Sequence, residues 1–238
     1  MVIFARFYAI IWDMGNDGIL WIVSTPIGNL GDITLRALET LRQADAVYAE
    51  DTRVSGKLLS HFEIKTPIRR LDAHTEMQSA EKVIERLAAG ERVAYISDAG
   101  TPGISDPGVR LATRVRAAGF RVETIPGPSA LTAALSIAGV PADEFLFLGF
   151  LPHKKGRQTA IKEIAASERT VVLYESTHRI MKLLTELSSA VSEKKITVAR
   201  ELTKIHEEVV SGTPSEVIQH FTSTPEKQRG EFVVIVSA

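Results

Sequence analysis

Residues 93–108 constrain the fold of this chain more than any other stretch. An apolar run at 93–96 is followed by a loop rich in Gly and Pro, and then by apolar residues at helical spacing. Open α/β sheets build ligand sites from such strand–loop–helix units, at the carboxyl ends of their strands. Asp106 is predicted to cap the helix, with Pro107 as its first residue. The loop therefore fits a ligand site, although a plain strand-to-helix connection would look the same.

Composition sets the outer bounds. A chain of 238 residues, 45% hydrophobic and 24% charged, fits one large or two small domains with a proper core. The net charge of −1 means that a nucleic acid would have to be held by local basic patches. The absence of cysteine excludes disulfides, thiolate metal sites and cysteine nucleophiles, and is compatible with the cytoplasmic location that we expect.

Strand and helix patterns alternate through the first 140 residues, which predicts a mainly parallel sheet covered by helices. Strands are expected there at 19–24, 46–49, 68–71, 93–96 and 121–125. The second half has more adjacent strands and predicts a mixed sheet, with strands at 145–150, 170–174, 196–199, 208–210 and 231–236. We therefore expect a two-domain α/β protein, with an extension at 1–18, an N-terminal domain at 19–140 and a C-terminal domain at 145–238.

Several helix boundaries can be predicted from side chains. Thr34 or Asp32 is expected to cap the helix that carries Leu35, and Thr75 with Gln78 would form a capping box. A second capping box is expected at Thr213 and Glu216, and a helix is expected over residues 176–190.

The N-terminal residues 2–12 are nearly all apolar. This run is too short to span a bilayer, and no small-residue cleavage site follows it. We interpret it as an extension ahead of the first strand, and we expect no membrane association.

Six stretches together carry a family resemblance. They are residues 24–34 (STPIGNLGDIT), 49–53 (AEDTR), 97–108 (SDAGTPGISDPG), 125–130 (IPGPSA), 173–179 (LYESTHR) and 199–204 (ARELTK). In this order they resemble the bacterial ribosomal RNA small-subunit methyltransferase I family, a branch of the tetrapyrrole methylase superfamily. The resemblance runs from about Leu20 to the end of the chain.

The resemblance implies a specific activity. It implies a two-domain enzyme that binds S-adenosylmethionine in the cleft between its domains, as a homodimer and without a metal. The methyl group would go to the ribose 2′-hydroxyl of a cytidine in the decoding region of 16S rRNA, in the small ribosomal subunit. Family members commonly continue for some tens of residues past the last strand, so a chain that ends at Ala238 would be expected to bind the ribosome less tightly.

The motif positions also imply a cofactor site. It comprises Ile27, Asp98, Thr101, Ser129, Ala130, Tyr174, Ala199 and Glu231. The loop with Asp98 and Thr101 is longer than its superfamily counterpart, and its proline comes later. Chemically, a carboxylate such as Asp98 can accept hydrogen bonds from the amine of the cofactor, and Tyr174 and Ala199 can line an apolar slot for its adenine.

A ribose hydroxyl is a weak nucleophile, so a general base would help the transfer. The candidates are Asp51, Asp106, His74 and Glu201, and the sequence does not choose among them. Lys204, Arg200 and Arg53 could instead hold phosphate or stabilise the developing alkoxide.

RNA contacts are expected at small basic clusters. These are Arg53, Arg69, Arg70, Lys154, Lys155 and Arg157. The six histidines are dispersed along the sequence and predict no metal site.

Two other functions stay open. One is a tetrapyrrole C-methyltransferase, whose carboxylate-rich substrate would also attract basic residues. The other is a ribosome-associated protein that binds S-adenosylmethionine without turnover.

Overall fold

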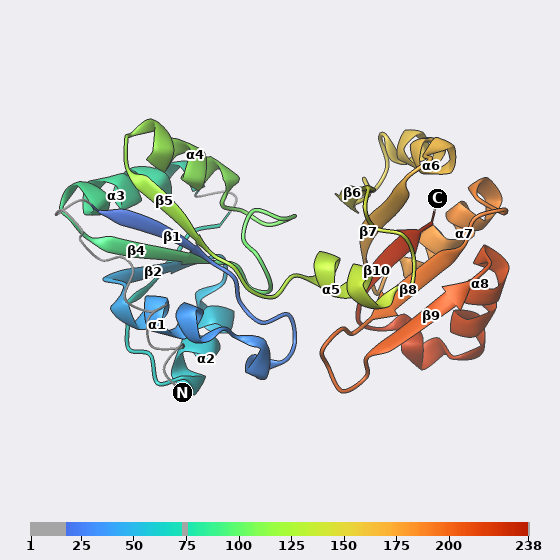
Figure 1. Ribbon diagram of the computed structural model, residues 1–238, viewed down its shortest axis with the longest axis horizontal. Helices are drawn as coiled ribbons and strands as arrows, with labels where there is room; N and C mark the ends of the chain where they lie inside the picture. Colours follow the sequence, from blue (N-terminus) through green and yellow to red (C-terminus); the bar gives the residue numbers. More distant parts are fainter. Residues whose placement is uncertain (1–17, 73–75, 238) are drawn as a thin grey trace, which may run out of the picture. The chain divides into compact units, whose positions relative to one another are not determined.

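The protein divides into two compact units, each built on one β-sheet (Figure 1). The computed structural model describes residues 18–72 and 76–237, so nearly all of the predicted extension 1–18 and the predicted cap at Thr75 lie outside the described residues. Residues 18–24, 34–98 and 106–126 belong to the first unit, and residues 25–33, 99–105 and 127–237 to the second. The predicted domain boundary between residues 140 and 145 stays a prediction. The second compact unit begins at Gly127 and also includes the two early loops 25–33 and 99–105.

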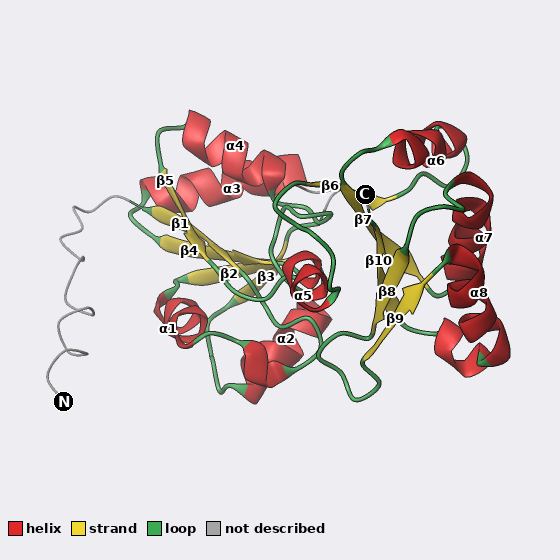
Figure 2. Ribbon diagram, turned by 45° about the vertical axis from the view of Figure 1, so that its right-hand side comes forward, coloured by secondary structure: helices red, strands yellow, loops and turns green. Residues whose placement is uncertain are grey.

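The sheet of the first unit is parallel throughout, in the order β3-β2-β4-β1-β5. Its strands are β1 (Ile19–Val23), β2 (Ala46–Ala49), β3 (Ile68–Arg70), β4 (Arg92–Ile96) and β5 (Arg121–Ile125). Its helices are α1 (Leu35–Gln43), α2 (Thr52–His61), α3 (Glu76–Ala88) and α4 (Val109–Ala117). Figures 1 and 2 show α3 and α4 on one face of the sheet and α1 and α2 on the other, which is why all four residues of β2 are apolar and buried.

The sheet of the second unit is mixed, in the order β6-β7-β10-β8-β9, with β6 parallel to β7 and the other pairs antiparallel. Its strands are β6 (Phe145–Phe150), β7 (Thr170–Ser176), β8 (Ile196–Arg200), β9 (Glu208–Gly212) and β10 (Glu231–Val236). Its helices are α5 (Ala130–Ile137), α6 (Arg157–Ala166), α7 (Ile180–Ala190) and α8 (Pro214–Ser223), and two 3-10 turns, η2 (Leu30–Asp32) and η3 (Pro225–Gln228), complete it. The predicted α/β class, with one parallel and one mixed sheet, is confirmed.

Strand alternation gives the second sheet two different apolar faces. Along β10, Phe232 and Val234 pack in the cluster formed with α6, α7 and α8. Val233 and Ile235 point to the opposite face and pack with α5 and with Ile27, a residue of the early loop 25–33. That loop is therefore anchored on the face of the second sheet that α5 covers.

Two of the predicted helix caps are confirmed. Thr34 accepts a hydrogen bond from the Ala37 amide (3.0 Å) and caps α1, and Thr213 with Glu216 forms the predicted capping box of α8. The helix predicted from residue 176 begins only at Ile180, so this prediction is wrong at its N-terminal end. The reason is that β7 continues to Ser176, paired with β10.

Candidate functional site

Acidic side chains gather at the carboxyl ends of the parallel strands in the first unit. Glu50 and Asp51 follow β2, and Asp98 follows β4. The Asp98 carboxylate accepts a hydrogen bond from the Asp51 amide (3.1 Å), which ties the two strand ends together. Asp106 belongs to the same acidic cluster, because the charges of Glu50 and Asp98 both affect its carboxyl group.

Asp106 has the properties of a general base at neutral pH. Burial is the main cause that raises its pKa to about 6, and the charges of Glu50 and Asp98 add to the shift against an opposing hydrogen bond from Ser97. A base whose pKa lies just below the working pH is ionised and still basic enough to accept a proton. Burial also raises the pKa of Glu50, with contributions from Asp98, Asp72 and Asp51.

The prediction that Asp106 caps α4 is wrong. The N-cap is Gly108, which has φ of 124° and no side chain to offer. The cap comes instead from Glu76 at the start of α3, whose Oε1 accepts hydrogen bonds from the amides of Gly108 (3.0 Å) and Leu111 (3.1 Å). No sequence spacing links Glu76 to Gly108, so sequence reasoning missed this residue.

Of the other candidates for the general base, Asp51 is engaged in capping and ion pairing, and His74 cannot be placed. Asp51 caps α2 by accepting from the Arg53 amide (2.8 Å), and it also forms an ion pair with the Arg53 guanidinium (2.6 Å). These hydrogen bonds hold the pKa of Asp51 well below its usual range, which makes it a weak base. His74 lies outside the described residues.

Three segments of the second unit meet around Gly100. The backbones of Thr25 and Gly100 form an isolated antiparallel bridge, with N···O distances of 2.9 and 3.1 Å. The Thr101 hydroxyl donates to the Pro128 carbonyl (3.1 Å). Loops 25–33 and 99–105 and the turn before α5 are thus joined into one structure, and it carries the predicted cofactor residues Ile27 and Thr101.

Tyr174 connects this structure to the sheet. Its hydroxyl accepts a hydrogen bond from the Leu131 amide (3.0 Å) in the first turn of α5, directly after Ser129 and Ala130. Its ring makes edge contacts with Phe147 and Phe150, at centroid distances of 4.9 and 5.7 Å. The Ser129 side chain makes no capping hydrogen bond.

The remaining predicted site residues of this unit are Ala199, Glu201, Lys204 and Glu231, and one of them is apolar and buried while the other three form ion pairs. Ala199 is 1% exposed and packs in the apolar cluster with Ile27. Lys204 forms ion pairs with Glu201 (2.9 Å) and Glu231 (2.8 Å), so its charge is shared by two carboxylates. Burial opposes the charged forms, but these pairs outweigh it, so the pKa of Lys204 is raised and the pKa of Glu201 is lowered.

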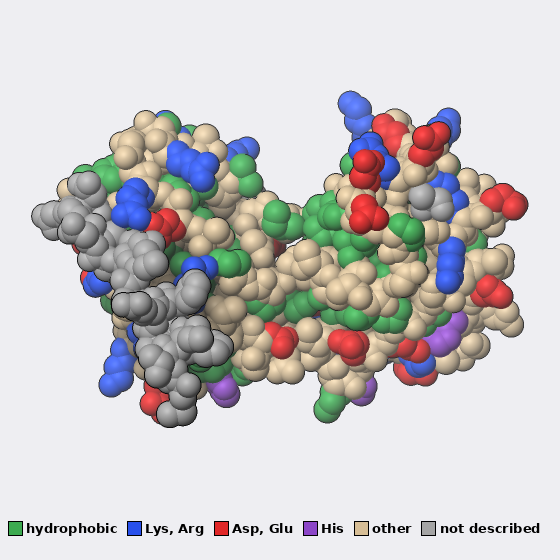
Figure 3. Space-filling model, in the orientation of Figure 1, with side chains coloured by type: hydrophobic (Ala, Val, Ile, Leu, Met, Phe, Trp, Pro, Cys, Tyr) green, Lys and Arg blue, Asp and Glu red, His purple; other side chains and the backbone are tan. Residues whose placement is uncertain are grey.

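The predicted basic residues are divided between the two units, with Arg53, Arg69 and Arg70 in the first and Lys154, Lys155 and Arg157 in the second. On the face shown in Figure 3, Lys and Arg side chains are interspersed with Asp and Glu. Lys154, Lys155 and Arg69 are exposed, and Arg70 pairs with Asp72 (2.6 Å).

Arg157 is buried and has a structural role. Its side chain is 3% exposed, and its guanidinium donates to Glu186 (2.7 Å) and to the Pro152 carbonyl (3.3 Å). It therefore fixes the start of α6 against α7 and is not available to RNA.

We expect Arg157→Ala to lower the free energy of unfolding by about 2 kcal/mol, because it leaves the carboxylate of Glu186 and the Pro152 carbonyl without their donor. Denaturant unfolding measures this, and the RNA affinity of the folded protein should be unchanged. The matched variants Lys154→Ala and Lys155→Ala should show the reverse, namely unchanged stability and a weaker salt dependence of RNA binding, by about one unit of slope per lysine. Weaker RNA binding in Arg157→Ala at unchanged stability would contradict the structural role.

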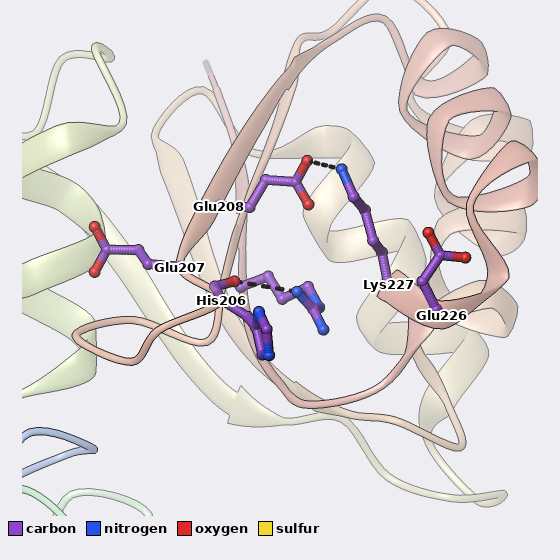
Figure 4. A pocket seen from close by; sticks show the side chains of 6 residues that line it. His206, Glu207, Glu208, Glu226 and Lys227 are labelled. Carbon is purple, nitrogen blue, oxygen red and sulfur yellow. Dashed lines mark hydrogen bonds and ion pairs between the residues drawn. The ribbon is translucent and has the colours of Figure 1, made fainter.

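The second unit also has a surface hollow of about 440 Å³, lined by Arg200, His206, Glu207, Glu208, Glu226 and Lys227 (Figure 4). Within it, Lys227 pairs with Glu208, and Arg200 donates to the His206 carbonyl (3.1 Å). Of the candidate site residues named from the sequence it contains only Arg200, which is not one of the predicted cofactor residues. Among the described residues, no group of His, Cys, Asp or Glu side chains could hold a metal ion, and no helix has the length and apolar character needed to cross a membrane.

Comparison with known proteins identifies the family to which this chain belongs. Residues 19–218 match the family model described as Tetrapyrrole (Corrin/Porphyrin) Methylases. Among solved structures, cobalt precorrin-4 methyltransferase superimposes with a TM-score of 0.69 at 17% identity over 96% of this chain and 98% of the other. Uroporphyrin-III-C-methyltransferase from Thermus thermophilus gives 0.63 at 20% identity, over 92% and 94%. The chain belongs to the tetrapyrrole methylases.

Sequence relatives narrow the family. The protein named Ribosomal RNA small subunit methyltransferase I is 48% identical in Xylella fastidiosa, over 94% of this chain and 82% of that one. In Escherichia coli O157:H7 the values are 46%, 93% and 78%, and in Thermotoga maritima 41%, 92% and 98%. The chain is therefore a member of the ribosomal RNA small subunit methyltransferase I family and a methyltransferase that uses S-adenosylmethionine, which confirms the predicted family, enzyme class and cofactor.

Proposed function

We propose that this protein methylates the ribose 2′-hydroxyl of a cytidine in the decoding region of 16S rRNA. The observation that carries the proposal is the 48% identity, over 94% of the chain, to a relative named as a small-subunit rRNA methyltransferase. The choice of nucleotide, the ribose oxygen as acceptor and the small subunit as partner are parts of the proposal.

The joined loops of the second unit fit the cofactor. S-adenosylmethionine supplies an activated methyl group on a sulfonium, and it carries a carboxylate and an adenine that the protein must bind. The first turn of α5 has backbone N–H groups besides that of Leu131 that could bind a carboxylate, because the Ser129 side chain does not cap it and Tyr174 accepts only from Leu131. Ile27 and the ring of Tyr174 offer apolar contact to the adenine, and Gly100 allows close approach of the backbone beside Ile27. Ala199 would support this surface from behind.

Asp106 is the general base that we propose for the ribose hydroxyl. Its raised pKa and its place at a strand-end edge support this role, whereas Asp51 is weakened by its pairing with Arg53. Glu201 is also a weaker candidate, because its carboxylate is paired with Lys204. Lys204 would have to leave one of its two carboxylates before it could stabilise an alkoxide.

The direct test is transfer of a radiolabelled methyl group from S-adenosylmethionine to three acceptors in parallel, namely unmodified small ribosomal subunits, naked rRNA and a porphyrinogen. Label at a ribose of the subunit RNA supports the proposal. Label only in the porphyrinogen would assign the protein to tetrapyrrole C-methylation. Intact cofactor binding with no label in any acceptor would instead favour a binding protein without turnover.

We also propose that the enzyme acts as a homodimer in the cytoplasm, where its ribosomal substrate is found. Light scattering of the purified protein tests the first point, since a monomeric mass across the working concentration range would exclude the dimer.

Tyr174→Phe is expected to weaken S-adenosylmethionine binding about three- to tenfold, because the Leu131 amide loses its acceptor and the first turn of α5 loses order. Calorimetric titration with the cofactor measures the effect. The aromatic contacts with Phe147 and Phe150 remain in this variant, so its melting temperature should change little. An unchanged Kd would show that Tyr174 does not organise the cofactor site.

A further inference from the structure

The start of α4 is held from a neighbouring helix. Figures 1 and 2 show α3 and α4 side by side on one face of the first sheet. Glu76, the first residue of α3, is 5% exposed, and one of its carboxylate oxygens accepts from both Gly108 and Leu111. These amides belong to the group that every helix start leaves without an intrahelical partner. A buried carboxylate thus replaces the cap that residues before a helix usually supply.

This arrangement leaves Asp106 available. Asp106 lies two residues before Gly108, and the sequence pattern predicts that its side chain should cap α4. Glu76 already accepts from the amides of Gly108 and Leu111, and the Asp106 carboxyl bonds to Ser97, which directly follows β4. An Asp that capped its own helix would accept backbone N–H groups, and these favour the ionised form and weaken the base.

We propose that Glu76 is a positioning residue for the methyl transfer, because by capping α4 from α3 it keeps the Asp106 carboxyl in the acidic cluster and away from its own helix. The inference rests on the proposed function for its kinetic consequence, whereas its effect on the Asp106 carboxyl can be measured without turnover.

The charged side chains around Asp106 lie at the carboxyl ends of the parallel strands in the first unit. Among the described residues, Glu50 after β2 and Asp98 after β4 act on its carboxyl group. Tyr95 of β4 is fully buried, and its burial raises its pKa. The charges of Glu50, Glu76, Asp98 and Asp106 raise this pKa further. All of these neighbours are acidic or neutral, so moving Asp106 from this cluster to the helix terminus should make it a stronger acid.

The experiment compares Glu76→Ala with Glu76→Gln, whose amide oxygen can still accept the two amides. Titration of the Asp106 side-chain carbon by NMR should show a pKa below that of the wild type in Glu76→Ala and a value near the wild type in Glu76→Gln. In methyl transfer to small subunits, Glu76→Ala should lose about tenfold or more in kcat/KM and Glu76→Gln much less, with the cofactor Kd nearly unchanged in both. The loss should be absent when Glu76→Ala is made in an Asp106→Asn background, because the two residues act as one unit.

A purely structural cap makes a different prediction. The double variant Thr213→Ala, Glu216→Ala removes the capping box of α8, and it should lower the melting temperature without changing kcat/KM. If Glu76→Ala does the same, with an unshifted Asp106 titration, the inference is wrong. If Glu76→Ala does not fold, Glu76→Asp replaces it, because the shorter side chain keeps the charge but reaches the two amides poorly, and an unshifted titration there also overturns the inference. If the wild type transfers no methyl group to rRNA, the proposed function fails, and the titration alone still decides the role of Glu76.

Discussion

Asp106→Asn is expected to lower kcat/KM for methyl transfer to the small subunit by about a hundredfold or more, since general bases contribute on the order of 10²- to 10⁴-fold. The amide keeps the size of the side chain and its contact with Ser97 but cannot accept the ribose proton. The cofactor Kd should stay within about twofold of the wild type, because the substitution keeps the size of the side chain and because, of the residues expected to bind the cofactor, only Asp98 belongs to the same unit as Asp106.

The pH dependence has a definite sign. With a pKa of about 6, Asp106 is protonated at lower pH and ionised at higher pH. Wild-type kcat/KM should therefore fall as the pH drops through about 6 and reach a plateau above it, and Asp106→Asn should lose this acid limb. Asp45→Asn is a matched control, because Asp45 is an exposed carboxylate of the same unit that pairs with Arg92. An acid limb that persists in Asp106→Asn would assign it to another group.

Patterns of buried side chains predicted the fold well. The strands at 46–49, 121–125, 145–150 and 231–236 have the predicted bounds, because each is an apolar or alternating run closed by polar or turn residues. The start of α7 was misplaced because the pairing of β7 with β10, a contact distant in sequence, extends the strand to Ser176.

The site was less predictable, for a related reason. The roles of Asp51 and Asp106 depend on which partner reaches each carboxylate, and the two share the local signature of a helix cap. Arg53 lies two residues from Asp51, whereas the residue that frees Asp106, Glu76, lies thirty-two residues before Gly108. Likewise, the composition of loop 153–157 does not show that Arg157 alone turns inward to Glu186. Local sequence identifies candidate residues, but tertiary contacts decide which of them are free to act.

Gly100→Val is expected to raise the Kd for S-adenosylmethionine by about tenfold or more, equivalent to about 1.4 kcal/mol. Gly100 has φ of +83°, and a Cβ there would lie 3.3 Å from Cγ2 of Ile27 and 3.7 Å from the Pro128 carbonyl oxygen. The two further methyl groups of Val need more room than these contacts leave, so the bridge to Thr25 or the position of Ile27 must change. Both belong to the loops that we propose bind the cofactor, and calorimetric titration measures the loss.

Gly119→Val separates this contact from backbone strain. Gly119 has nearly the same conformation, with φ of +87°, but a Cβ there would meet nothing within 4 Å. Both variants should lose stability through the strain of a β-branched residue in the left-handed region, which is about 1–3 kcal/mol. Only Gly100→Val should also lose cofactor affinity, because only there does the new side chain press on Ile27. Equal cofactor affinities in the two variants would show that the cofactor binds away from the loops joined at Gly100. That result would also contradict the proposed roles of Ile27 and Thr101.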